Sequence, residues 1–190
     1  MSEPAPARRS GRSRPARVGQ AVAALVVVTL TGFGLWRWTH PTVFGDLGDS
    51  IVAAPRPVAK AALSSTVVFP QIGGEPETVT IDDARPVFGR NTAEATAAFF
   101  ICHPKESEKP GIGAVHEPAN FCKELEPVEP GTAFRYGLEP ASDYMIVTIT
   151  PTRPGVAHLT HIELSYQRGA RHFFQQGTES IRVDRKVVAE

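Results

Sequence analysis

The chain has 190 residues, of which 42% are hydrophobic and 21% charged, and it contains 17 prolines and 16 glycines. This length suits about one domain, and the composition excludes a disordered chain, a collagen repeat and a coiled coil. Twenty basic residues balance twenty acidic residues, so the formal net charge is zero. That balance argues against nucleic acid as a partner.

The charges are distributed unevenly along the chain. Residues 1–38 carry six arginines and one acid, a net charge of +5, whereas residues 39–190 carry fourteen basic and nineteen acidic residues, a net charge of −5. Residues 1–17 are rich in Pro, Ala, Arg and Ser and show no apolar periodicity. We expect them to form a disordered basic tail in the cytoplasm, which sets the topology and could also attract anionic lipid headgroups.

An uncharged apolar segment follows this tail. The nineteen residues Val18–Trp36 contain no charged side chain. A helix of that length spans about 28 Å, close to the roughly 30 Å hydrocarbon core of a bilayer. We therefore predict a single-pass transmembrane helix over residues 18–38 that acts as an uncleaved signal-anchor in the cell membrane. Because the arginines precede it, the positive-inside rule places the N-terminus in the cytoplasm and the C-terminal part outside it.

Aromatic and basic residues end the apolar segment. Trp36, Arg37 and Trp38 are expected at the outer membrane interface, where an indole ring is buried while its N–H stays hydrated. A cleaved signal peptide is the alternative, since it has the same basic-then-apolar order. Its cleavage site would need small residues, but Gly32-Phe33-Gly34 is followed by the bulky Leu35, and the segment is longer than a usual signal core.

The remaining chain has the pattern of turns and short apolar segments that is typical of an all-β protein. Prolines and glycines interrupt residues 39–60, which we expect to form a stalk or linker. Residues 61–190 alternate short apolar segments with Pro/Gly turns, which predicts a single antiparallel β-sandwich of immunoglobulin-like architecture outside the cytoplasm. About seven short strands are expected, and the clearest patterns lie at 66–69, 78–81, 97–102, 144–150, 160–167, 171–175 and 179–187.

The strand at 97–102 has a competing interpretation. Asn91 and Glu94 resemble a helix capping box, from which a helix could continue to Ala98. Phe99, Phe100 and Ile101 favour a strand instead, and we predict a buried strand.

Cys102 and Cys122 are the two cysteines of the chain. An even number of cysteines outside the cytoplasm favours a disulfide between them. It would close a polar loop and stabilise the fold by about 3 kcal/mol through loop-closure entropy. Metal binding by this pair is the weaker alternative, because the cysteines do not form a C-x-x-C motif.

No catalytic constellation is evident. The sequence contains no G-x-S-x-G elbow, no S-x-x-K motif and no phosphate-binding glycine loop, so we predict neither an enzyme nor a cofactor. A copper site of cupredoxin type needs a free Cys followed a few residues later by His and Met. His103 directly follows Cys102, and Met145 is the only methionine beyond the apolar segment, so the motif fails.

The histidines supply weak candidates for metal ligands, which are His103, His116 and Glu117 in the expected loop, and His161 and Glu163 on the expected strand. Pro118 biases Glu117 toward an extended conformation, in which it points away from His116. On a regular strand His161 shares a face with Glu163 and His158 points the other way, unless a bulge occurs near Leu159.

One aromatic pair remains, Phe173-Phe174. On a strand the two rings point to opposite faces, so one could be exposed as a partner contact, although cover by a second sheet is the simpler interpretation. Taken together, the sequence predicts a membrane-anchored chain that presents a β-sandwich as a binding or assembly module. Its expected partners are the lipid bilayer and another membrane or envelope protein. A metal-handling or hydrolytic ectodomain is the alternative.

Overall fold

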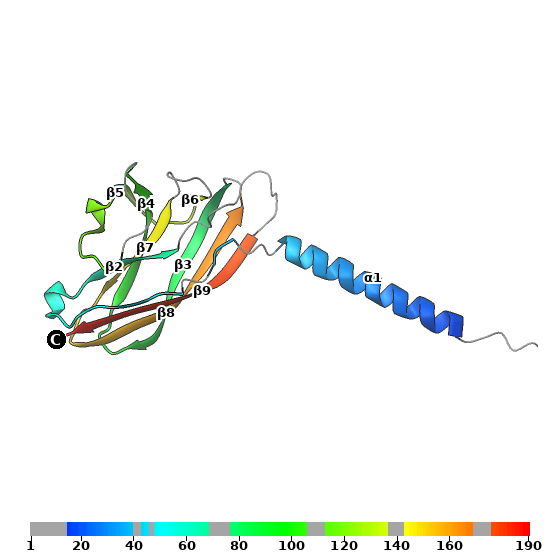
Figure 1. The fold of residues 1–190 in the computed structure, drawn as a ribbon, viewed down its shortest axis with the longest axis horizontal. Coiled ribbons are helices and arrows are strands. Elements are labelled where there is room, and N and C mark those ends of the chain that lie inside the picture. The colour runs from blue at the N-terminus through cyan, green and yellow to red at the C-terminus, as the bar shows by residue number, and fades with distance from the viewer. Residues whose placement is uncertain are drawn as a thin grey trace, which may run out of the picture. The chain divides into compact units, whose positions relative to one another are not determined.

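The structure, a computed structural model, describes residues 15–39, 43–45, 48–68, 77–105, 113–136, 143–168 and 176–190. The chain divides into two compact units, Met1–Trp38 and Thr39–Glu190 (Figure 1).

The N-terminal unit contains one helix, α1 (Pro15–Thr39). Its large apolar side chains are exposed on consecutive positions, including Leu25, Val26, Val27 and Val28, so they point in every direction around the helix axis. Within the part of the chain that the structure describes, no helix is long and apolar enough to cross a membrane. The transmembrane helix expected over residues 18–38 is therefore not confirmed.

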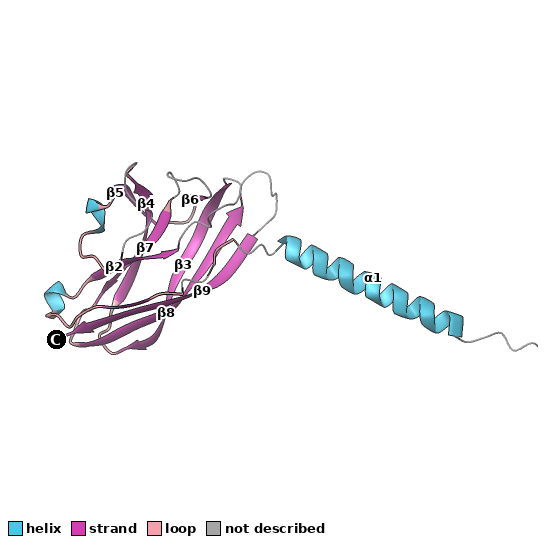
Figure 2. Cartoon of the chain, viewed as in Figure 1, coloured by secondary structure: helices cyan, strands magenta, loops and turns pink. Residues whose placement is uncertain are grey.

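The C-terminal unit is a two-sheet β-sandwich, which confirms the all-β prediction for this part of the chain (Figure 2). Its described residues form nine strands. The first sheet has the order β1 (Ser50–Val52), β9 (Gln176–Ala189), β8 (Gly155–Arg168), β3 (Glu77–Asn91) and β6 (Thr132–Tyr136). The second sheet has the order β2 (Leu63–Val68), β7 (Tyr144–Thr150), β4 (Thr96–Pro104) and β5 (Cys122–Pro127). Adjacent strands are antiparallel, except that β1 runs parallel to β9.

Alternating apolar residues of the two sheets form the core. On β8 the side chains of Ile162, Leu164 and Tyr166 are fully buried, as the alternation in the sequence predicted. The predicted strand at 144–150 coincides with β7, and 97–102 lies within β4. The helix alternative is wrong, because the side chain of Asn91 binds both the N–H and the carbonyl of Ala95 and closes a turn before β4.

The strands of the first sheet are longer than the sequence pattern suggested. β3 continues through Pro86 to Asn91, and its pairing with β8 shifts register at three places. On β8 the register with β9 shifts between Leu159 and His161, the place at which the sequence allowed a bulge. Bulges interrupt the period-two pattern, and for this reason the sequence pattern covered only part of each long strand.

Much of the expected stalk belongs to the sandwich. We call the described residues 43–45 and 48–60 the strap. Val43 and Phe44 of the strap are only 5% and 7% exposed and belong to the core. Further along the strap, β1 pairs with β9, and a short 3₁₀ helix, Val58–Lys60, leads toward β2. In its described residues, the segment expected as a linker is thus packed along one sheet edge.

Candidate functional site

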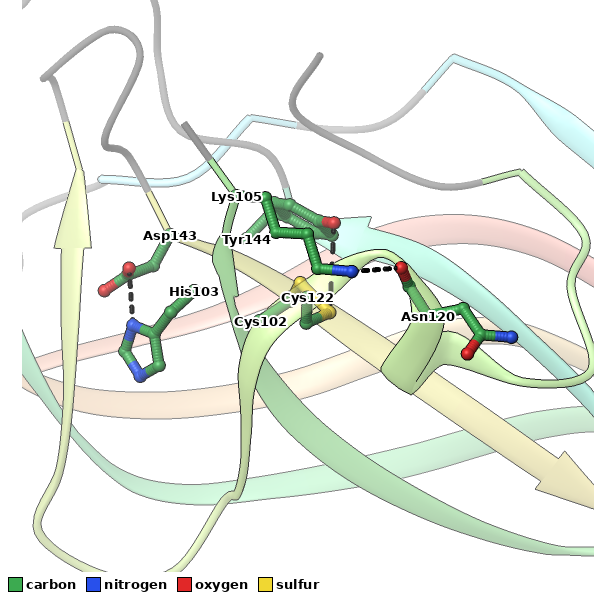
Figure 3. Close-up of a disulfide and its surroundings, with 7 residues drawn as sticks. All are labelled: Cys102, His103, Lys105, Asn120, Cys122, Asp143 and Tyr144. Carbon is green, nitrogen blue, oxygen red and sulfur yellow. Dashed lines mark hydrogen bonds and ion pairs between the residues drawn. A yellow bond between two sulfur atoms is a disulfide. The ribbon is translucent and has the colours of Figure 1, made fainter. Parts of the chain in front are cut away.

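The clearest cluster of chemistry-bearing side chains lies beside a disulfide (Figure 3). Cys102 on β4 and Cys122 at the start of β5 are bonded, as predicted, with their Cα atoms 5.4 Å apart. Both residues are buried, and the hydroxyl of Tyr144 lies 4.0 Å from the Cys122 sulfur. Lys105 Nζ donates a 2.6 Å hydrogen bond to the carbonyl of Asn120, which joins the two sides of the loop near the disulfide.

The disulfide-closed loop also covers an edge strand. Val115 and Ser64 of β2 exchange two backbone hydrogen bonds of 2.8 and 2.9 Å. Next to this bridge, His116 donates from Nδ1 to the carbonyl of Ala62 at 2.8 Å. The described part of the loop therefore occupies backbone groups of β2 that would otherwise form an open sheet edge.

Asp143, directly before β7, is the centre of the cluster. Its carboxylate is completely buried, and burial of a charge is costly unless partners compensate for it. Arg135 on β6 supplies its backbone N–H at 3.0 Å and its guanidinium at 3.3 Å. The hydrogen bond and the charge of Asp143 raise the pKa of Arg135 above its ordinary value. The residue that precedes β7 of the second sheet is thus joined to β6 of the first sheet.

His103 of β4 completes the cluster. Its Nδ1 lies 2.7 Å from a carboxylate oxygen of Asp143, which fixes the orientation of the ring. Its Nε2 faces the carboxylate of Glu126 on β5 at 3.4 Å. The ring is 18% exposed, whereas the Glu126 side chain is 44% exposed. We call His103, Glu126, Arg135 and Asp143 the His103 cluster.

The His103 cluster resembles the histidine and carboxylate of a catalytic triad, but its described residues lack the nucleophile. A buried carboxylate that orients the Nδ1 of a histidine prepares Nε2 for proton transfer or for metal binding. In the described residues, Nε2 meets a carboxylate rather than a Ser or Cys nucleophile. No group of three or more His, Cys, Asp or Glu side chains in the described ranges is arranged to hold a metal ion. These described residues therefore show an electrostatic connection among β4, β5, β6 and the residue that precedes β7.

The structure does not bring the other candidate ligands together. Glu117 accepts a hydrogen bond from Asn120, while His116 is bound to a backbone carbonyl. His161 and Glu163 lie on the outward side of β8, and their cross-strand neighbours on β3 are Val87 and Arg85.

His158 has an ion-pair partner of its own. Its Nε2 lies 2.8 Å from the carboxylate of Asp184 on β9. Hydrogen bonds from Ser50 and then from His158 hold the pKa of Asp184 below its ordinary value. The bulge allows His158 to face the same side as His161, but the partner of His158 is this carboxylate.

Several sequence candidates lie outside the described residues. These are residues 1–14 of the basic tail, the strand expected at 171–175 with Phe173-Phe174, and the side chains of Arg37 and Trp38. The tail was expected to be disordered over residues 1–17, but its last three residues belong to α1. Trp36 is described, and its ring stacks on that of Phe33 with the centroids 6.3 Å apart.

Sequence reasoning missed the charged residues that connect separate segments. Asp143, Glu179 and Arg185 carry no motif. For Arg185 a signal was present, because it occupies an inward position in the alternation of Ile181, Val183 and Val187. A basic residue at such a position predicts a buried and hydrogen-bonded charge.

Comparison with known proteins adds no relative: no family model, curated protein or solved structure matches this chain.

Proposed function

We propose that this chain is a single-pass membrane protein that presents its β-sandwich outside the cytoplasm as a non-enzymatic binding or assembly module. The observation that carries the proposal is the character of α1. Its large apolar side chains from Val22 to Trp36 are 49–68% exposed, which is unfavourable in water unless an apolar environment covers them. The uncharged length of Val18–Trp36 and the arginines before it favour a bilayer as that environment.

The disulfide supports the proposed side of the membrane. Structural disulfides persist in oxidising compartments and are rare in the cytosol. The Cys102–Cys122 bond belongs to the same unit as the sandwich, whereas the arginine-rich tail belongs to the other unit. This distribution agrees with an N-terminus in the cytoplasm and a C-terminal unit outside it.

The contacts made by buried charged side chains of the sandwich support a binding role. The buried charges of the His103 cluster and of Arg185 are used in contacts between strands. Such contacts make a rigid scaffold, and rigid scaffolds position surfaces for recognition. An immunoglobulin-like architecture, the finer form of the fold prediction, fits the same role.

The test combines membrane extraction with partner capture. The full chain should resist extraction by alkaline carbonate, and photo-crosslinkers on the sandwich should capture one envelope or membrane protein. Reciprocal tagging should recover the same pair. A matched control carries an unrelated sandwich on residues 1–42 and should lose the partner. Carbonate extraction of the full chain, or a monomer that forms no crosslink, would contradict the proposal. Stoichiometric zinc or copper in the purified chain would favour the metal-handling alternative.

A further inference from the structure

Basic side chains gather on the outward face of the first sheet, where β3, β8 and β9 are neighbours (Figure 1). Arg90 of β3 is paired in register with His158 of β8, which is paired in turn with Lys186 of β9. Residues directly opposite each other in antiparallel strands point to the same face of a sheet. Ala157 and Leu159, on either side of His158, are buried, so this row of three basic residues faces outward.

A second row adds to the positive charge of this face. His161 of β8 is paired with Arg182 of β9. Arg182 is exposed, whereas its strand neighbours Ile181 and Val183 are buried, so this row faces outward as well. We call five residues of the two rows the basic patch: Arg90, His158, His161, Arg182 and Lys186.

The basic patch has little negative charge to balance it. Among the described residues of the two rows and of the position between them, the one acidic side chain is Asp184, which lies 2.8 Å from His158. Neither Arg90 nor Lys186 has an ion-pair partner within the described chain. Their charges flank His158 from both sides, and like charges on neighbouring strands are unfavourable in a sheet. Folding therefore gives no reason for this arrangement.

The net charge of the chain makes the basic patch more unusual. Residues 39–190 carry fourteen basic and nineteen acidic residues, a net charge of −5. The patch concentrates positive charge on one face of an acidic domain. It ends at the next row, where Arg85 of β3 is paired with Glu163 of β8 and the charges balance.

Apolar side chains border the basic patch on its other sides. Val52 of β1 is paired with Lys186 and is 63% exposed. Val156 and Val188 form the adjoining row and are half-buried. With strands about 4.8 Å apart and about 3.3 Å per residue, the patch measures about 10 Å across the strands and about 13 Å along β9. It is a surface of cations with an apolar border.

We propose that the basic patch binds an acidic segment of a partner protein, whose carboxylates pair with Arg90 and Lys186 and whose apolar side chains cover Val52. This inference deepens the proposed binding function and rests on it for the existence of a partner. Complementary charge across an interface selects the partner and speeds association. The apolar border favours a protein, because a polysaccharide or a nucleic acid would leave these valines uncovered.

The first test measures binding of an acidic peptide to the full chain in neutral detergent. The probe is a fluorescein-labelled oligoglutamate of about ten residues, which is long enough to cross the patch when extended. Its fluorescence anisotropy should rise with the unmodified chain, and an oligoglutamine of the same length should not bind. R90E/K186E should weaken binding about tenfold, because each reversal removes an exposed ion pair and adds a repulsion.

Two further variants serve as controls. K60E/K123E changes the net charge by the same amount at exposed lysines outside the patch, and it should bind the peptide as the unmodified chain does. R90Q/K186Q removes the charges without reversal and should weaken binding about threefold. Retention of the Cys102–Cys122 bond and of the urea midpoint shows that a variant still folds. Equal binding by R90E/K186E and K60E/K123E overturns the inference, and so does binding of dextran sulfate without binding of oligoglutamate.

The second test places photo-crosslinkers on two faces of the sandwich in native membranes. A crosslinker at Val52 should capture the partner, and R90E/K186E should abolish that capture while K60E/K123E leaves it unchanged. If crosslinkers at neither Val52 nor Lys123 capture a protein, the proposed function fails, whereas the peptide measurement still decides whether the patch binds acidic segments. Capture from Lys123 alone supports the proposed function and overturns this inference. Capture of lipid alone at Val52 also overturns it.

Discussion

Replacement of Phe44 by Ala tests whether the strap is part of the folded sandwich. Phe44 is 7% exposed and packs edge-on against two aromatic rings. Truncation of a buried Phe costs about 3–5 kcal/mol, so we expect F44A to lower the free energy of unfolding by about 4 kcal/mol. With a urea dependence of about 2 kcal/mol per molar, the midpoint should fall by about 2 M.

The measurement is pulse proteolysis of the full chain in mild detergent over a range of urea concentrations, since this method follows the sandwich separately from the helix. The matched control is V52A on β1, because Val52 is 63% exposed and its truncation should cost less than about 0.5 kcal/mol. If F44A and V52A unfold at the same urea concentration, the strap is not part of the core.

Three further variants test the charged and covalent contacts. The double variant C102S/C122S should lose about 3 kcal/mol of stability in the same assay, and equal stability would contradict a role for loop closure. D143N should cost about 3 kcal/mol, because a buried carboxylate with cationic partners is replaced by a neutral amide, and an unchanged midpoint would refute that assignment. Asp184 has a lowered pKa, so its contribution exists above the unfolded pKa of about 3.9 and disappears as the pH falls through the folded value. D184N should thus lose less than about 1 kcal/mol at pH 7, and this loss should shrink as the pH falls below the unfolded pKa, as thermal unfolding over that pH range would show; a loss that does not change with pH would contradict the linkage.

The strands and the disulfide were predictable because their signals are local. A short run of apolar and β-branched residues located β7, which is buried on both faces. Alternation of apolar residues located the buried face of β8, since a strand that buries one face repeats every two residues. The disulfide was predictable from the number of cysteines and the inferred compartment. These signals do not report which strands become neighbours, and the immunoglobulin-like form of the sandwich stays a prediction.

The strap and the His103 cluster were not predictable because long-range contacts define them. Glu179 lies 136 residues from Val43, and Asp143 lies 40 residues from His103. Proline and glycine in residues 39–60 indicate irregular backbone, but an irregular segment laid along a sheet edge has the same composition as a flexible linker. The length of β3 was underestimated for a related reason. Pro86 lies in a bulged part of β3 that pairs with β8 on one side and, among the described residues, has no strand on the other side.

Membrane topology is the most direct test of the central proposal, that α1 crosses the bilayer once and delivers the sandwich to the outside. The measurement is protease treatment of intact cells that express the chain with one epitope tag at each end. The account predicts that the C-terminal tag is removed from intact cells while the N-terminal tag survives until the membrane is permeabilised. A C-terminal tag that survives in intact cells and is removed only after permeabilisation would contradict it.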